Sequence, residues 1–137
     1  MQAELKVAEN SAKIKEYSST QQITEKIDEQ IAATKTTIGE YLHKLDNIRT
    51  AAANETDKKR EQIYVNGIEI IVNTKPLNEL KAIEMAARSN IERLTALKMA
   101  RESLELLEIF SNIRDLKYLV LEKEGIPERI LVKKLIY

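Results

Sequence analysis

One short segment constrains what this chain can fold into. Residues 63–72, IYVNGIEIIV, have the composition of β-strands, whereas the sequence on both sides is typical of long helices. Within this segment, Asn66-Gly67 is the dipeptide best suited to a two-residue type I′ turn, because both turn positions need a positive φ. The sequence therefore predicts a β-hairpin over residues 61–73.

The predicted hairpin has one largely apolar face. With a two-residue turn, Val65 faces Ile68 and Ile63 faces Ile70, so their side chains share one side of the ribbon. Two strands alone are not stable in water, and the ribbon therefore needs further strands. The nearest candidates are the same residues in a neighbouring subunit. We therefore predict five oligomerisation positions: Ile63, Val65, Ile68, Ile70 and Val72.

Composition excludes several classes of protein. The chain has 137 residues, of which 43% are hydrophobic, so it can bury one core and a single domain over residues 1–137 is the default. Lys plus Arg and Asp plus Glu both number 22, which argues against a binder of nucleic acid driven by bulk charge. The absence of cysteine excludes disulfides and thiol chemistry. No apolar run approaches the roughly 20 residues of a membrane span, and the first residues lack a signal-peptide core. We expect a cytoplasmic protein without a membrane segment.

The sequence before the hairpin predicts a first helix over about residues 2–58, with a break near residues 18–20. Ser19 and Gln22 can form a capping box that restarts the helix after the break. Beyond the break, one set of positions alternates steps of three and four, which is the 3.5-residue period of a left-handed coiled coil. This seam needs a partner helix. It consists of Thr24, Ile27, Ile31, Thr34, Ile38, Tyr41, Leu45, Ile48, Ala52 and Glu55.

A second helix is predicted over about residues 77–124. The second half of this segment is apolar on more than one face, so it should touch more than one neighbour. Gly125 and Pro127 are typical of a helix stop. The tail, residues 126–137, fits either a strand or a short amphipathic helix, and we favour helix because a lone strand would have no mate there. The expected fold is mostly α: a long antiparallel helical hairpin or coiled coil with a central β-hairpin and a short C-terminal element.

Little in the sequence indicates chemistry. Glu40 and His43 form E-x-x-H, half of a di-metal pattern of helical bundles, but they fall on the outer side of the predicted seam, where solvated side chains are expected. The three glycines, at 39, 67 and 125, allow no phosphate-binding loop. We predict no catalytic, cofactor-binding or metal-binding residue, and therefore a protein that is not an enzyme.

Two basic clusters, Lys58-Lys59-Arg60 and Lys133-Lys134, have two interpretations. Nucleic-acid contact uses such groups, but a single Phe and five Tyr leave few aromatic side chains for base stacking. Solvated charge is the favoured interpretation.

The run Gln62-Ile63-Tyr64, then Gly67, then Ile70-Ile71-Val72, followed by a helix with Leu80, Ile91, Leu94 and Leu97, resembles the succession in prefoldin β-type subunits. The resemblance covers about residues 62–97. It implies a hexamer in which hairpins close into β-barrels, with the five oligomerisation positions forming the barrels. It also implies coiled coils whose tips hold non-native proteins without ATP.

The ends of the chain leave two alternatives open. Apolar residues there either contact clients or partners or pack as a satellite core; they are Leu5, Val7, Ile130, Leu131 and Leu135. For function, the leading hypothesis is a non-enzymatic homo- or hetero-oligomeric coiled-coil protein, a prefoldin-like holdase for unfolded protein clients. The chief alternative is a compact helical bundle that acts as a scaffold or adaptor subunit of a larger viral or nucleoprotein complex. A nucleic-acid-binding accessory subunit is the third.

Overall fold

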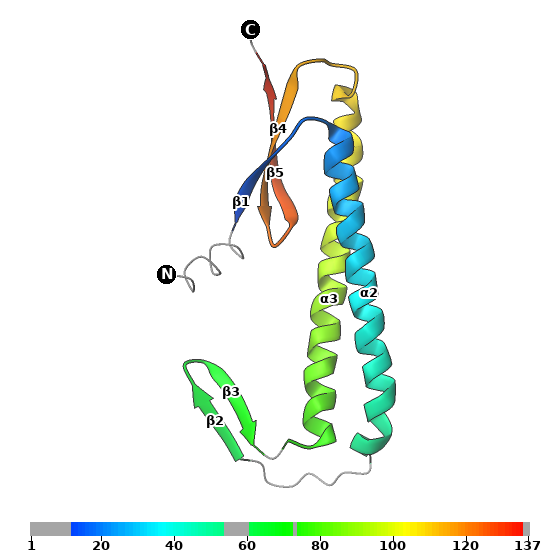
Figure 1. Cartoon of the computed structure of the whole chain (residues 1–137), viewed down its shortest axis with the longest axis vertical. Helices are drawn as coiled ribbons and strands as arrows, with labels where there is room; N and C mark the ends of the chain where they lie inside the picture. The colour runs from blue at the N-terminus through cyan, green and yellow to red at the C-terminus, as the bar shows by residue number, and fades with distance from the viewer. Residues whose placement is uncertain (1–11, 54–60, 73, 136–137) are drawn as a thin grey trace. The chain divides into compact units, whose positions relative to one another are not determined.

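The structure is a computed structural model of the chain, and it describes residues 12–53, 61–72 and 74–135. The elements are β1 (Lys13–Tyr17), α2 (Thr20–Ala53), β2 (Glu61–Val65), β3 (Ile68–Val72), α3 (Pro76–Leu104), the 3₁₀ helix η1 (Glu105–Phe110), β4 (Leu116–Lys123) and β5 (Ile126–Lys134) (Figure 1). In the described part of the chain, strands β1-β4-β5 form one antiparallel sheet and β2-β3 another. Internal contacts divide the chain into two compact units. The described residues of unit 1 are 12–35 and 93–135, and unit 2 lies between them in sequence.

The expectation of a mostly α fold is wrong. About 60% of the described residues are helical and 27% are in strands, so the fold is mixed α/β. The correction comes from unit 1, where three segments expected to be helical form the three-stranded sheet. The single domain expected over the whole chain stays a prediction.

The first correction concerns the segment before α2. Residues 13–17 were expected to be helical but form strand β1, which pairs with β4. Helix propensity is a weak preference that pairing with a neighbouring strand overrides. The break near residues 18–20 is present, since α2 begins at Thr20. There the Gln22 backbone N–H donates to Ser19 Oγ at 3.2 Å, and the Gln22 side chain accepts from the Ser18 N–H at 2.9 Å.

The second correction concerns the expected helix over residues 77–124. Helix α3 ends at Leu104, η1 continues to Phe110, and residues 116–123 form β4 at the centre of the sheet. A central strand can be apolar on both faces, and such a short apolar run cannot be told from a buried helix by its period.

The tail is the third correction, because residues 126–134 form strand β5 and not a helix. A strand at this position was expected to have no neighbouring strand to pair with, but β5 pairs with β4. Glu124 and Gly125 connect β4 to β5 with φ values of 54° and 78°. Gly125 is therefore a turn glycine between strands and not the stop of a helix.

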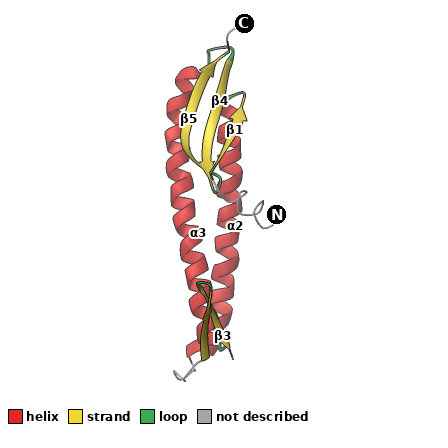
Figure 2. Ribbon diagram, turned by 90° about the vertical axis from the view of Figure 1, so that its left-hand side faces the viewer, coloured by secondary structure: helices red, strands yellow, loops and turns green. Residues whose placement is uncertain are grey.

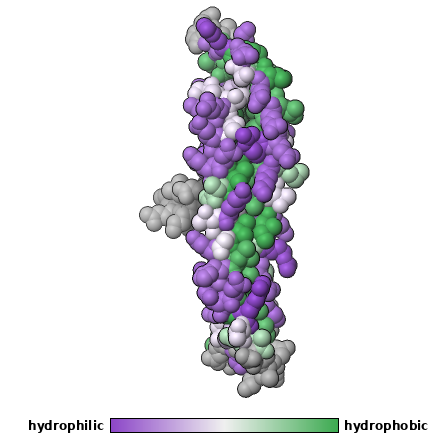
Figure 3. Space-filling view, turned by 90° about the vertical axis from the view of Figure 1, so that its right-hand side faces the viewer, coloured by the Kyte–Doolittle hydropathy of each residue, from purple (hydrophilic) through white to green (hydrophobic). Residues whose placement is uncertain are grey.

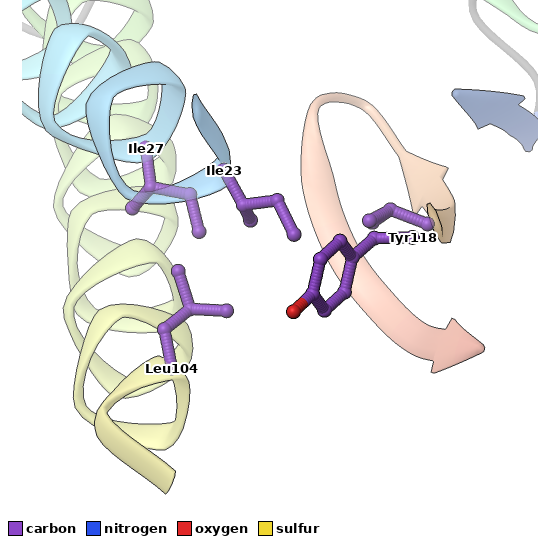
Figure 4. Close-up of a cluster of buried hydrophobic side chains, with 5 residues drawn as sticks. Ile23, Ile27, Leu104 and Tyr118 are labelled. Atoms are coloured by element: carbon purple, nitrogen blue, oxygen red, sulfur yellow. The ribbon is translucent and has the colours of Figure 1, made fainter. Parts of the chain in front are cut away.

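The core of unit 1 lies between the helices and one face of the sheet (Figures 2 and 4). Alternation along β4 directs Tyr118 and Val120 toward the helices, where they meet Ile23, Ile27 and Leu104. Ile23 and Ile27 are each 1% exposed and Val120 is fully buried. This inner face of the sheet is thus covered by α2 and α3.

Most buried side chains of α2 lie on the seam that the sequence predicts, whereas Ile23, which is 1% exposed, lies outside it, one residue before Thr24. Those on the seam include Ile27, Thr34, Ile38, Leu45 and Ala52, all at most 9% exposed. Thr34 is the polar residue among them, and its hydroxyl donates a hydrogen bond to the backbone carbonyl of Gln30 in the same helix, at 2.7 Å. In unit 1, an ion pair between Asp28 of α2 and Arg101 of α3, at 2.9 Å, links the two helices beside the core.

Replacing Gly125 by alanine is expected to lower the free energy of unfolding by about 1 kcal/mol or more. The positive φ disfavours any Cβ, and the new Cβ would also lie 2.7 Å from Gln30 Nε2, so that side chain would have to move. Gly39→Ala is the matched control, because Gly39 lies within α2 with open space around it and alanine should raise stability by about 1 kcal/mol. Urea denaturation measures both changes. A stabilising Gly125→Ala would contradict the turn described here.

Candidate assembly interface

The β2–β3 hairpin adopts the register that the sequence predicts. Val65 pairs with Ile68 and Ile63 with Ile70, and Glu61 lies opposite Val72. Asn66 and Gly67 have φ values of 50° and 81°, as a type I′ turn requires. The alternation of side chains along both strands therefore separates an apolar face from a mixed one.

The mixed face of the hairpin lies toward α3 within unit 2. Gln62 Nε2 donates to Glu69 Oε1 at 3.0 Å across the two strands. A groove of about 350 Å³ separates this face from the first turns of α3. Its lining residues are Gln62, Glu69, Ile71, Asn78, Lys81, Ala82 and Met85. Because this face is turned toward the helix across the groove, the apolar face points away from the helix.

The apolar face of the hairpin is open to solvent. The exposed fractions of its side chains are 49% for Ile63, 47% for Val65, 65% for Ile68, 43% for Ile70 and 36% for Val72. The structure thus brings all five predicted oligomerisation residues together on one exposed surface. Among the described residues, no third strand pairs with β2 or β3, so both edges of the ribbon are also open.

Such a surface has a strong tendency to be buried. Full burial of a Val or Ile side chain contributes about 1.5–3 kcal/mol, and these residues retain about a third to two thirds of their exposure. Contiguous apolar patches on proteins generally mark interaction sites, and an open strand edge adds unpaired backbone donors and acceptors. The apolar hairpin face is therefore the best candidate for a functional surface.

A second local feature is a buried carboxylate in the three-stranded sheet. Glu122 of β4 is 3% exposed, and its Oε1 accepts a hydrogen bond from the Tyr17 hydroxyl at 2.8 Å. Lys15 Nζ lies 3.8 Å from Oε2, which has no hydrogen-bond partner among the described residues. Burial, and then the hydrogen bond to Glu122 and its charge, raise the pKa of Tyr17 well above its ordinary value of 10.0. This tyrosine stays neutral and ties β1 to β4.

Replacing Tyr17 by phenylalanine is expected to cost about 1–3 kcal/mol near neutral pH, because the buried Glu122 carboxylate loses a donor. The raised pKa of Tyr17 also has a consequence at high pH. Its stabilising contribution is complete below the ordinary value of 10.0 and is lost as pH rises above it. The free energy of unfolding, measured by urea denaturation, should therefore fall more between about pH 8 and about pH 11 for the native chain than for Tyr17→Phe. Equal losses would contradict the burial of this hydroxyl.

The three predicted client-contact residues that the structure describes are not brought together. Leu5 and Val7 lie outside the described residues. Ile130 packs against the core of unit 1, whereas its neighbour Leu131 is 52% exposed on the opposite face of β5. Leu135 is half-buried, and its N–H donates to the Asp115 carbonyl at 2.7 Å. Of these three residues, Ile130 alone packs against the core cluster, and the choice between client contact and satellite core stays open.

The other sequence candidates remain isolated. Glu40 and His43 are both exposed on α2. Within residues 12–53, 61–72 and 74–135, no group of three or more metal-ligating side chains is placed to hold an ion. Lys133 and Lys134 are exposed on β5, and Lys58-Lys59-Arg60 lie outside the described residues.

Sequence reasoning missed two exposed apolar groups in unit 1. One is on the face of the three-stranded sheet that points away from the helices; it includes Ile14, and it also holds Leu131, which was a candidate by itself but not as part of this group. The other is on η1, where Leu106 and Ile109 are about three-quarters exposed. Alternation along residues 116–122 was the signal for the first group, but it was hidden by apolar residues on both faces of β4.

No helix in the described part of the chain has the length and hydropathy that crossing a membrane requires. Comparison of the chain with known protein families, with curated proteins and with solved structures finds no match.

Proposed function

We propose that this chain is a non-enzymatic assembly protein whose β2–β3 hairpin joins copies of itself. The observation that carries the proposal is the apolar hairpin face, whose five side chains are all at least 36% exposed while the opposite face lies toward α3. A two-stranded ribbon with a bare apolar face has too little packing of its own to be stable in isolation. Contact with another chain supplies the missing packing.

A second copy of the chain fits this surface well. The five exposed side chains of the face are Ile and Val, so two identical faces can bring these residues together without burying an unpaired charge among them. Self-complementary patches of this kind are characteristic of two-fold interfaces between identical subunits. The open edges of β2 and β3 also allow hairpins from several copies to continue one sheet or close a barrel. A barrel is the arrangement that the resemblance to prefoldin subunits implies.

Replacing Gly67 by valine is expected to weaken this assembly by a kcal/mol or more, because a β-branched residue is strained at a φ of 81°. No neighbouring atom lies within 4 Å of the new Cβ, so the effect acts through the turn alone. Light scattering at several protein concentrations measures the mass. Asn66→Gly is the control, since glycine accepts a positive φ and should leave the mass unchanged. An unchanged mass for Gly67→Val would show that the hairpin is not the joint.

Holding of non-native proteins is the second candidate function. Met85 and Met99 of α3 are 69% and 64% exposed, and flexible methionine side chains suit adaptable apolar binding. Hydrophobic surface also lies open among hydrophilic side chains on the face shown in Figure 3. A holdase would suppress the aggregation of a chemically denatured protein diluted into buffer without ATP. Replacing both methionines by glutamine should then reduce the suppression without changing the native mass, and an unchanged suppression would argue against this role.

A further inference from the structure

The 3₁₀ helix η1 presents three distinct rows of side chains. Residues three apart lie above one another in a 3₁₀ helix, because it has 3.0 residues per turn. Leu107 and Phe110 form the row turned inward, and Leu107 packs against the core of unit 1. The other rows are acidic and apolar. They consist of Glu105 with Glu108 and of Leu106 with Ile109, and together we name them the η1 ridge.

The apolar part of the η1 ridge is unusually exposed. Leu106 and Ile109 are 74% and 75% exposed, the highest values for large hydrophobic side chains among the described residues. Neither the Glu105 nor the Glu108 carboxylate forms an ion pair with another described residue. The ridge is therefore an apolar strip with a negative border that its own unit leaves uncovered.

The outer face of the three-stranded sheet is also apolar, but the charged side chains beside its apolar residues are mostly basic. Its apolar side chains follow from the pairing of β4 with β1 and β5 and are Ile14, Leu119, Leu121 and Leu131. Ile14 and Leu131 are 65% and 52% exposed, and Figure 2 shows this face turned away from the helices. Lys117, Arg129 and Lys133 lie on the same face by register. Lys117 is paired with Glu16 at 3.2 Å, whereas Arg129 and Lys133 form no ion pair with another described residue.

We propose that the η1 ridge of one copy packs on the outer sheet face of a second copy. Apolar side chains then meet apolar side chains, and the two glutamates of the ridge face Arg129 and Lys133. A sheet covered by helices on both faces is a common layered arrangement, and among the described residues of one copy helices cover only the inner face. Electrostatic complementarity of this kind fixes the partner and the orientation.

The ridge cannot serve the outer face of its own sheet. Leu107 of η1 packs into the core on the inner face, so η1 lies on the helical side of the sheet. The outer face is on the other side. A second copy is thus needed, and the contact joins two different surfaces, unlike the hairpin contact between identical ones. This interface is separate from the proposed hairpin joint and does not depend on it.

The absence of cysteine makes a direct test possible. One chain carries Ile109→Cys and a second, with a different tag, carries Leu131→Cys; both sites are exposed, so the fold should tolerate them. Under mild oxidation, the disulfide between the two chains should form at least about tenfold faster than with Lys35→Cys, an exposed site on α2, in place of Leu131→Cys. A rate equal to that of the Lys35→Cys control would overturn the proposal.

Charge reversal tests the orientation. Adding Glu105→Lys and Glu108→Lys to the Ile109→Cys chain should reduce the disulfide rate several-fold, and adding Arg129→Glu and Lys133→Glu to the Leu131→Cys chain should restore it. A rate that neither change affects would contradict the charge pairing. The hairpin is unchanged in all these chains, so these differences in disulfide rate test the η1 interface and not the hairpin joint. A parallel pair of Ile68→Cys chains reports on that joint alone.

Discussion

Replacing Ile70 by lysine is expected to break the proposed hairpin joint and to lower the mass of the assembly toward the 15.7 kDa of a single chain. Ile70 lies in the middle of the apolar hairpin face, opposite Ile63, and 43% of its surface remains exposed within one copy. Assembly would bury that surface, so an ammonium group there must lose its hydration without gaining a partner. The loss of apolar contact and the buried charge together should weaken each contact by roughly 3 kcal/mol or more, which is over a hundredfold in the dissociation constant.

The matched control for this change is Tyr64→Lys. Tyr64 lies on the opposite face of the same hairpin, is 67% exposed and pairs with Glu69, which an introduced lysine can approach. Sedimentation velocity should therefore show the native mass for Tyr64→Lys and a lower mass for Ile70→Lys. Equal masses for the two variants would contradict an interface on the apolar face.

Replacing Ile27 by alanine is expected to reduce the free energy of unfolding by about 2–5 kcal/mol. Ile27 is 1% exposed and packs in the core of unit 1 with Leu104 and Tyr118, so its truncation leaves a cavity between the helix and the sheet (Figure 4). Leu42→Ala is the control on the same helix, because Leu42 is 45% exposed and its loss should cost much less. Urea denaturation of both variants gives the comparison. Similar losses would contradict the placement of the core.

These two substitutions act on different quantities. The apolar hairpin face belongs to unit 2 and lies outside the core of unit 1, so Ile70→Lys should change the mass more than the stability of unit 1. Ile27→Ala should do the reverse. Assembly and folding are thus separable by experiment.

The hairpin was predictable because its signals are local. Asn66 and Gly67 determine the turn, and the turn determines which side chains of β2 and β3 face one another. Most buried positions of α2 were also predictable, since a 3.5-residue period over Ile27–Leu45 leaves one narrow seam. In both cases the prediction depends only on residues that are close together in the sequence.

The three-stranded sheet was not predictable in the same way. Its central strand β4 pairs with β1, about a hundred residues earlier in the chain, and this pairing decides that Lys13–Tyr17 is a strand. Apolar residues on both faces of β4 obscured its two-residue period. Glu124 also has a positive φ, an uncommon conformation for a residue other than glycine, so the β4–β5 turn lacked the signal that Asn66 provides.

The resemblance to prefoldin β-type subunits stays a prediction. It concerns residues 62–97, which include β3 and most of α3, whereas the sheet of unit 1 is an element that the resemblance does not imply. The resemblance implies that the hairpin mediates assembly, and the exposure of the apolar hairpin face is the separate structural reason for proposing the same role. The outer sheet face and the η1 ridge add a second surface on which copies can meet.

The most direct test of the hairpin joint is the mass of the native chain compared with that of Ile70→Lys, both measured by sedimentation equilibrium over a dilution series. We predict for the native chain a mass that is a multiple of 15.7 kDa and that falls toward this value only on dilution, and a lower mass for Ile70→Lys. A native mass of 15.7 kDa at every concentration, or equal masses for the two chains, would contradict the account.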